Sequence, residues 1–230
     1  MNRKNIVVII PAFNEENSVG KVVKDIPKNI VSKIIVVDNN SNDLTKVNAL
    51  AVGAIVVDEP LQGYGNACLK GMTYVAEMDT KPDIIVFIDA DYSDYPEEIE
   101  KLIKPILQED YDMVIGSRVL GNREKGSMTP QQIFGNWLAT SLLKLFYKVS
   151  YTDLGPFRAI KYVKLLELRM IDKTYGWTVE MQLKAAKHKL KITEVPVTYR
   201  VRIGHSKISG TVKGTVLAGY KIITTIFKYL

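Results

Sequence analysis

The chain has 230 residues, of which 47% are hydrophobic and 24% charged, and its 9 prolines and 15 glycines are ordinary for a globular domain. The formal net charge of +6 suits phosphorylated small molecules or anionic lipid, but the basic residues form no face interleaved with aromatics, so we expect no nucleic-acid partner. No apolar run reaches the roughly 18 to 20 residues of a membrane span, no signal peptide is recognisable, and Cys68 has no disulfide partner, so we expect a cytoplasmic protein with Cys68 packed in its core.

Short apolar runs and helix-like segments alternate through the first half of the chain. Continuous runs rich in Ile and Val that alternate with helices indicate an α/β fold, with a parallel sheet covered by helices on both faces. The strands are expected at residues 5–10, 33–37, 54–57, 84–88 and 112–115. The helices between and after them are expected at residues 15–26, 44–51, 66–77 and 96–108.

The helix expected at residues 96–108 contains signals for its start and for an interruption. Asp94 is the expected N-cap, and Pro96 stands in the first turn, where proline is favoured. Pro105 lies inside the same segment, so the helix is expected to kink or split there.

The second half of the chain has longer amphipathic segments and more basic residues. Pro196 predicts that the one strand expected there lies at an edge of the sheet. A stripe of apolar residues at intervals of three and four, with Lys221 and Lys228 at other positions, marks the last helix. The expected elements are a helix at 131–148, a turn-rich segment at 153–161, a helix at 176–187, a strand at 192–199, a basic loop at 199–214 and a helix at 215–230.

Polar residues follow three of the predicted strands at the point where each strand ends. They read PAFNEE at residues 11–16, DNNSND at 38–43 and DADYSD at 89–94. Because ligands of parallel sheets bind beyond the carboxyl ends of the strands, we expect these segments to line one binding edge. Asp89 and Asp91 form a D-x-D pair that suits Mg²⁺ or Mn²⁺, with water and phosphate oxygens completing the coordination shell.

Basic residues in the loop at 199–214 complement this acidic edge. Arg200, Arg202, His205 and Lys207 are expected to neutralise a phosphate group, which arginine can bind through two parallel hydrogen bonds. The glycine-rich stretch GYGNACLKG at residues 63–71 matches neither a G-x-G-x-x-G fingerprint nor a P-loop, which argues against a nicotinamide dehydrogenase and a P-loop kinase.

Taken in order, these motifs resemble the family 2 glycosyltransferases of the GT-A fold. PAFNEE, VVDNNSND, GYGNACLKG, FIDADYSD and GSR carry this resemblance through the first half of the chain. DLGPFRAIK, YGWTVEMQLKAA and YRVRIGHSKISGT are similar to the branch that contains the dolichyl-phosphate and polyprenyl-phosphate sugar synthases. The resemblance implies an inverting, metal-dependent transfer of one sugar from a nucleotide-diphosphate sugar to polyprenyl phosphate, by a protein bound peripherally to the inner face of the membrane.

The resemblance also implies how one GT-A domain of 230 residues is divided. Residues 1–118 would bind the nucleotide sugar, residues 119–210 would bind the acceptor and supply the basic closing loop, and residues 211–230 would form the amphipathic C-terminal helix.

Donor, metal and acceptor residues are carried over from the matched motifs. Glu15 would reach the ribose, Asp38 the base, and Asp91 the metal, with Asp89 on the ribose or the metal. The full donor set is Pro11, Ala12, Asn14, Glu15, Asp38, Asn40, Gly65, Asn66, Asp89, Ala90, Asp91, Arg202 and Lys207. The acceptor set is Arg118, Arg123, Gln132 and Asn136.

The catalytic residues depend on the acceptor. Asp91 and Arg118 are expected to act on the donor's metal and on the acceptor's phosphate. An alcohol acceptor needs a general base, for which Asp153 and Glu180 are the candidates, whereas a phosphate oxygen is already anionic. The alternatives are that Asp153 anchors a turn and that Glu180 is an exposed helix residue.

Several alternatives remain open from the sequence. The donor is expected to be a UDP-sugar, UDP-glucose first and GDP-mannose next, because Asn39, Asn40 and Ser41 stand where dolichyl-phosphate mannose synthases have Asp-Gly-Ser. A soluble phosphorylated molecule or sugar is the alternative acceptor. A nucleotide-binding regulatory protein without catalysis is the alternative from another class of function. Three positions are open for the C-terminal helix: on a membrane, on its own domain, or on a second copy in a homo-oligomer.

Overall fold

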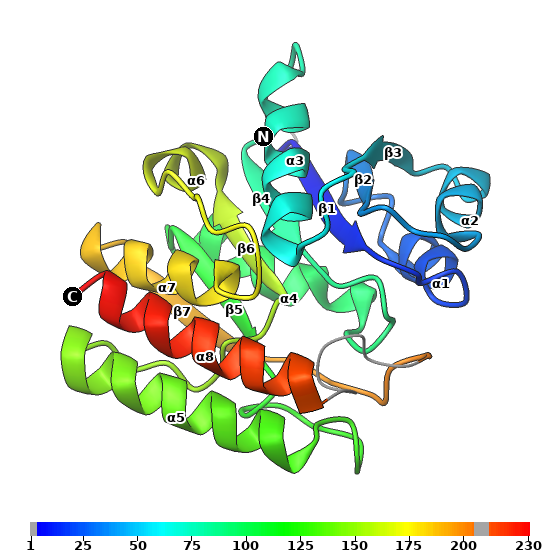
Figure 1. Ribbon diagram of the computed structural model, residues 1–230. Coiled ribbons are helices and arrows are strands. Elements are labelled where there is room, and N and C mark those ends of the chain that lie inside the picture. The colour runs from blue at the N-terminus through cyan, green and yellow to red at the C-terminus, as the bar shows by residue number, and fades with distance from the viewer. Residues whose placement is uncertain (1–3, 205–211) are drawn as a thin grey trace.

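The computed structural model describes residues 4–204 and 212–230. Seven strands within these residues form one sheet in the order β3-β2-β1-β4-β6-β5-β7 (Figure 1). The strands are β1 (Ile6–Ala12), β2 (Lys33–Asp38), β3 (Ile55–Asp58), β4 (Ile84–Phe87), β5 (Met113–Ser117), β6 (Arg158–Lys161) and β7 (Ile192–Pro196). The helices are α1 (Val19–Asp25), α2 (Thr45–Ala51), α3 (Tyr64–Glu77), the 3₁₀ turn η1 (Pro96–Glu98), α4 (Ile99–Gln108), α5 (Pro130–Tyr147), α6 (Tyr162–Glu167), α7 (Trp177–Lys187) and α8 (Val212–Lys228).

Strands β3, β2, β1 and β4 are parallel neighbours, as the alternating pattern predicts. All seven residues of β1 are buried because its successive side chains enter two different cores. Val7 and Ile9 pack in the core that α3, α5 and α7 cover, whereas Val8 and Ile10 pack in the core that α1, α2 and α4 cover. Cys68 is buried in the first of these cores, as expected.

The turn-rich reading of residues 153–161 is wrong in its second half. Residues Arg158–Lys161 form β6, an antiparallel strand inserted between β4 and β5. The strand has only four residues and begins with a buried arginine, so its sequence lacks the apolar run by which the other strands are recognised. The Arg158 guanidinium is fully buried and donates to the carbonyl oxygens of Leu154, Gly155 and Thr178. Backbone acceptors therefore satisfy the charge that makes this segment look exposed.

Two helices depart from the prediction in how they begin or divide. Residues 96–108 do split, but between η1 and α4 rather than at Pro105, which lies inside α4 and whose carbonyl still accepts from the Glu109 N–H. Helix α1 begins at Val19 rather than at residue 15, because Asn14 adopts a left-handed φ of 53° and a turn follows it. Strand β7 lies at the sheet edge as Pro196 predicts, although it ends at that proline.

Helices α5 and α8 lie side by side along one flank of the molecule (Figure 1). Phe146 of α5 and Phe227 of α8 contact each other with ring centroids 5.5 Å apart. Ile226 is fully buried between the helices, whereas Val216 and Tyr220 are exposed. The last helix therefore packs on its own domain with one face and turns part of its apolar stripe outward. Among the described helices, none is long and apolar enough to cross a bilayer.

Candidate active site

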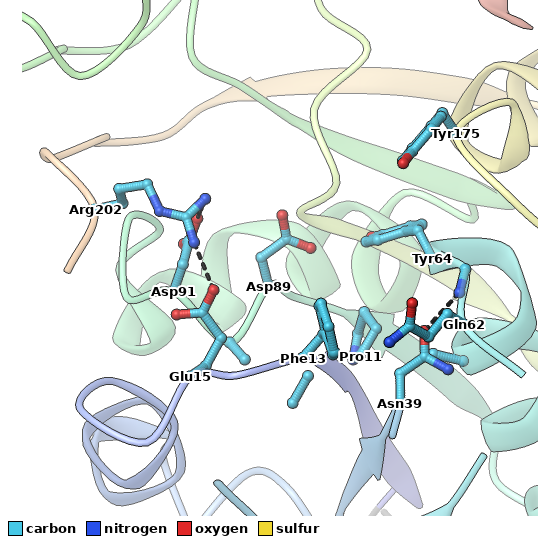
Figure 2. A pocket seen from close by; sticks show the side chains of 14 residues that line it. Pro11, Phe13, Glu15, Asn39, Gln62, Tyr64, Asp89, Asp91, Tyr175 and Arg202 are labelled. Atoms are coloured by element: carbon cyan, nitrogen blue, oxygen red, sulfur yellow. Dashed lines mark hydrogen bonds and ion pairs between the residues drawn. The ribbon is translucent and has the colours of Figure 1, made fainter. Parts of the chain in front are cut away.

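A cleft of about 330 Å³ opens beyond the carboxyl ends of β1 and β4, within the size range of small-molecule sites. Figure 2 shows acidic and basic side chains gathered at one end and aromatic and amide side chains at the other. The lining residues are Pro11, Ala12, Phe13, Glu15, Asn39, Gln62, Gly63, Tyr64, Ala67, Asp89, Ala90, Asp91, Tyr175 and Arg202.

Arg202 joins two of the strand-end motifs at the charged end of the cleft. Its Nη2 lies 2.5 Å from Glu15 Oε1, and its Nη1 lies 3.2 Å from Asp91 Oδ2 (Figure 2). The backbone N–H of Ile203 donates to the Asp91 carbonyl at 3.0 Å, which holds this part of the chain beside β4. The structure therefore brings together the predicted residues Glu15, Asp91 and Arg202, while Lys207 and His205 lie outside the described residues.

Arg200 has a different place from the one predicted for it. Its guanidinium is stacked against the rings of Tyr92 and Tyr95, at 3.4 and 4.0 Å from their centroids, and its Nε donates to the Tyr92 carbonyl. The stacking covers the face of the Arg200 guanidinium, and the hydrogen bond uses one of its edge N–H groups. Arg200 thus anchors the chain that carries Arg202 instead of facing a phosphate in the cleft.

Asp89 lies between the two ends of the cleft and is poorly solvated. Its Oδ1 and the hydroxyl of Tyr64 are both buried without a hydrogen-bond partner among the described residues. Burial and the nearby charge of Asp91 raise the pKa of Asp89 to about 7. An unsatisfied carboxylate oxygen at the end of the central strand is suited to a cation or a hydroxyl group of a ligand.

Replacing Asp89 with Asn is expected to raise the melting temperature of the protein measured without metal and nucleotide. A carboxyl whose folded-state pKa is raised costs stability when it ionises, so the cost is complete above about pH 7 and shrinks as the pH falls toward the ordinary 3.8. The gain from D89N should therefore be larger at about pH 8 than at about pH 5. The exposed Asp79→Asn is the control. A D89N gain that is absent, or equal at both pH values, would contradict the raised pKa.

The residues present fit a divalent cation only if the ligand supplies part of its shell. Among residues 4–204 and 212–230, no three His, Cys, Asp or Glu side chains gather into a complete metal-binding set. Asp89 and Asp91 nevertheless offer two carboxylates at one strand end, and Asp89 Oδ1 has no other partner there. Mg²⁺ and Mn²⁺ sites that bind substrate phosphates commonly use one or two carboxylates in this way.

Asp94 does not cap the helix after Pro96, so that prediction is wrong. No side chain caps η1, and both carboxylate oxygens of Asp94 are buried without a partner in the described part of the chain. Burial and the charge of Asp89 hold the pKa of Asp94 well above its ordinary value. The main chain explains the inward position: Asp94 forms an isolated antiparallel bridge with Tyr199, which turns the residue away from the helix.

Arg118 and Asp153 form a buried ion pair and are not among the residues that line the cleft. Asp153 Oδ2 accepts from the Arg118 backbone N–H and Nε, both at 2.8 Å, and Oδ1 accepts from Nη2 at 2.6 Å. Burial opposes ionisation of Asp153, but the charge and hydrogen bonds of Arg118 outweigh it and keep its pKa below the ordinary value. Asp153 is therefore a structural counter-ion rather than an accessible base. This agrees with the alternative that Asp153 anchors the local turn.

Glu180 is neither an exposed helix residue nor a base in the cleft. It is fully buried in α7, where it accepts from the backbone N–H groups of Ile171 and Asp172 and pairs with Lys184 at 2.8 Å. The hydroxyl of Tyr229 donates a further hydrogen bond at 2.6 Å. Both base candidates are thus engaged in structural contacts.

The other predicted acceptor residues surround the start of α5. Gln132 completes a capping box with Thr129 at the N-terminus of that helix. The Asn136 amide donates to the Thr152 carbonyl and accepts from the Leu154 N–H, which fixes the segment before β6. Arg123 is exposed and contacts the sulfur of Met128. Their role toward an acceptor, like that of Arg118, stays a prediction.

Some predicted donor residues do not line the cleft but hold its walls. Asn14 accepts from the Asn42 N–H, and Asn66 donates to the carbonyls of Leu61 and Gln62. Asp38 is buried at the end of β2, with Oδ1 unpartnered among the described residues. Asn40 is exposed with a left-handed φ of 65°, and Gly65 meets the chain's own backbone, as described below.

Several lining residues were missed by reasoning from the sequence. Asn39 is buried and accepts from the Gly63 N–H at 2.8 Å, so it joins the second strand end to the glycine-rich stretch. Because β2 is buried on both faces, its alternation gives no signal that would favour Asn39 over Asn40. Phe13 lies inside the PAFNEE motif itself. Tyr64 and Tyr175 carry no local signal, because tertiary contacts alone bring them to the cleft.

The arrangement of one mostly parallel sheet, flanking helices and an Asp pair at the central strand end is that of the GT-A fold. Residues 7–167 match the family described as glycosyl transferase family 2, and the chain belongs to this family of glycosyltransferases. The chain is 34% identical to an uncharacterised protein of Methanocaldococcus jannaschii, over 97% of its own length and 91% of that protein.

Two further relatives have named activities or ligands. The chain is 30% identical to the UDP-N-acetylglucosamine–dolichyl-phosphate N-acetylglucosaminyltransferase of Methanococcus voltae, over 96% of its own length and 94% of that enzyme. It is also similar in structure to glucosyl-3-phosphoglycerate synthase from Mycobacterium tuberculosis, crystallised with Mn²⁺, uridine diphosphate and phosphoglyceric acid. The TM-score is 0.77 at 22% identity, covering 98% of this chain and 78% of the other. This likeness shows the shared GT-A fold.

Proposed function

We propose that the chain transfers one sugar, with inversion, from a nucleotide-diphosphate sugar to polyprenyl phosphate at a membrane surface. The observation that carries the proposal is the polarity of the cleft. Glu15, Asp91 and Arg202 form a charged end, and aromatic and amide side chains form an uncharged end (Figure 2). A nucleoside diphosphate has the same division between its diphosphate and its base.

Asp89 and Asp91 would hold a Mg²⁺ or Mn²⁺ ion at the charged end. When bound, such an ion neutralises charge that develops on the departing diphosphate. Arg202 is placed to bind the same diphosphate, because its guanidinium already lies against Asp91 and Glu15. Glu15 is held for this contact by two hydrogen bonds. Its backbone N–H donates to Thr45 Oγ1, and its carboxylate accepts from the Ser18 hydroxyl.

A phosphate acceptor is favoured because both candidate bases are already held in structural ion pairs and hydrogen bonds. Asp153 is locked to Arg118, and Glu180 to Lys184 and two backbone N–H groups. An alcohol acceptor would need one of them to take a proton, whereas a phosphate monoester attacks with an oxygen that is already anionic. The M. voltae relative, whose name gives dolichyl phosphate as its acceptor, supports the same class.

A membrane surface is favoured by the exposed faces of α5 and α8. Phe134 and Trp137 on α5 and Tyr220 and Phe227 on α8 are each at least half exposed, at 60%, 61%, 68% and 50%. Aromatic side chains beside lysines are typical of helices that lie in the interface of an anionic bilayer. The protein would then work peripherally on the cytoplasmic face.

A UDP-sugar is the proposed donor, with UDP-glucose first and GDP-mannose next. The UDP-N-acetylglucosamine donor in the name of the M. voltae relative supports a uridine nucleotide and adds that sugar to the set. A soluble phosphorylated acceptor is the second candidate, favoured by the phosphoglyceric acid bound in the structurally similar synthase.

The test is a panel of UDP- and GDP-sugars with a short polyprenyl phosphate and Mg²⁺ or Mn²⁺, scored by released UDP or GDP and by the lipid product. We expect release with one sugar, dependent on both the metal and the lipid phosphate. Turnover on phosphoglycerate or a sugar in place of the lipid would favour the soluble acceptor. Failure of every donor with either acceptor class would overturn the proposal.

Binding to liposomes that contain anionic lipid tests the membrane setting separately. The wild type is expected to float with the vesicles, and Trp137→Ser combined with Phe134→Ser to float less, because an exposed aromatic face would be lost. The control is Leu61→Ser. Leu61 is also an exposed apolar residue, but it lies before α3 and not on α5 or α8. Equal flotation of all three proteins would contradict docking through α5.

A further inference from the structure

Tyr175 closes the uncharged end of the cleft from the segment that connects α6 to α7. It lies near Tyr64, across the cleft from Phe13 and Pro11, and its side chain points toward the space between them (Figure 2). The charged end, with Arg202 and Asp91, lies at the opposite side. An aromatic ring at this position can cover the planar base or the ribose of a nucleotide whose diphosphate occupies the charged end.

We propose that Tyr175 contacts the nucleoside of the donor, and that helix α8 holds Tyr175 in place through the Tyr175 segment, residues 171–176. The inference rests on the proposed function and adds a donor-binding residue and a positioning element to it. The contacts of this segment with α3 and α8 carry the second part.

The Tyr175 segment is pressed against the N-terminus of α3 on its cleft side. The Lys173 carbonyl accepts from the Asn66 N–H at 3.0 Å. A Cβ atom on Gly65 would lie only 2.0 Å from the Asp172 carbonyl oxygen, so the two backbones approach as closely as glycine allows. Gly65 thus gives room to the backbone of the Tyr175 segment, whereas Gly63 and Tyr64 of the same stretch line the cleft.

The same segment is held by α8 on its other side. Lys221 Nζ lies 2.9 Å from Asp172 Oδ2, while Asp172 Oδ1 accepts from the Thr174 N–H at 2.8 Å. A Cβ atom on Gly176 would lie 2.6 Å from the buried Thr225 Oγ1. Asp172 therefore links an α8 lysine to the turn that immediately precedes Tyr175.

Buried Glu180 fixes the start of the segment to the end of α8. Its carboxylate accepts from the Asp172 N–H at 2.7 Å and from the Tyr229 hydroxyl at 2.6 Å. A segment with backbone bonds to α3 and side-chain bonds to α8 cannot keep both sets if α8 is displaced. The C-terminal helix is in this way a part of the donor cleft's wall.

The experiment measures binding of UDP and of GDP, each with Mg²⁺, to the full chain by calorimetry without lipid or acceptor. Tyr175→Ala is expected to weaken the tighter nucleotide about 5- to 150-fold, as for loss of one base–aromatic contact. Tyr175→Phe should retain affinity. In turnover, Tyr175→Ala should raise the donor KM with kcat nearly unchanged, because the contact is made equally before and during reaction.

Lys221→Met tests the positioning role and is expected to weaken nucleotide binding about 2- to 30-fold, with recovery in Lys221→Arg. Lys144→Met on α5 is the control, since it removes the same charge from an exposed position and Lys144 forms no ion pair in the described residues. Melting temperatures of all variants show whether each is folded, and Tyr175→Leu replaces Tyr175→Ala if the latter unfolds.

Each outcome has one meaning. A wild type that binds neither nucleotide overturns the proposed function and this inference with it. Wild-type binding that Tyr175→Ala or Tyr175→Leu leaves unchanged overturns the nucleoside contact while the donor chemistry stands. Equal affinities of Lys221→Met and Lys144→Met overturn the positioning by α8.

Discussion

Asp91→Asn is expected to lower sugar transfer on the order of 10²- to 10³-fold while leaving the fold intact. Asp91 Oδ2 faces Arg202 at 3.2 Å, and Oδ1 accepts from the Ser93 N–H at 3.0 Å. Asparagine keeps the volume and the acceptor for Ser93 but removes the negative charge that would hold a cation. Initial rates measured across a Mn²⁺ titration should show a lower maximum and a higher metal concentration for half activation.

Asp58→Asn is the matched control for Asp91→Asn. Asp58 also ends a parallel strand and pairs with a cation, Lys46 at 2.7 Å, but it is exposed at the outer strand β3 and does not line the cleft. Its variant should transfer sugar at the wild-type rate. Wild-type turnover by Asp91→Asn at saturating metal would remove Asp91 from the metal site.

The parts of the site that could be predicted are those that local sequence determines. A parallel strand places its last residues at the sheet edge whatever the rest of the chain does, so Glu15 and Asp91 could be assigned from PAFNEE and DADYSD. Arg202 is expected at this edge from the basic loop, and the structure places it against two carboxylates there, Glu15 and Asp91.

The parts that could not be predicted depend on contacts between distant segments. Asp94 stands just before Pro96, where a helix N-cap is expected, but its backbone bridge to Tyr199 turns it inward. Arg158 reads as a polar turn residue until the carbonyls that surround it are known. Tyr175 reaches the cleft only because α3 and α8 hold its segment from two sides.

The pair of Arg118 and Asp153 shows the same limit and leads to the largest expected effect on stability. The sequence places both residues in loops and suggests a separate catalytic role for each. In the fold they satisfy each other through three hydrogen bonds in a region where Asp153 is fully buried. Each residue therefore needs the other as its counter-charge, because either charge left alone there would be poorly solvated.

Asp153→Asn is expected to lower the free energy of unfolding by about 3 to 5 kcal/mol, since Arg118 would remain buried without its counter-charge. Denaturant unfolding with a fixed slope measures the loss. Asp110→Asn is the control, because its partner Lys161 lies at 2.6 Å but Asp110 is 91% exposed, so little change is expected. The double variant Arg118→Met with Asp153→Leu should recover part of the loss, since no unpaired charge remains. If the two residues acted independently, the double variant would have a lower free energy of unfolding than Asp153→Asn, because a second defect would be added. That result would show that the unpaired charge of Arg118 is not the reason for the loss.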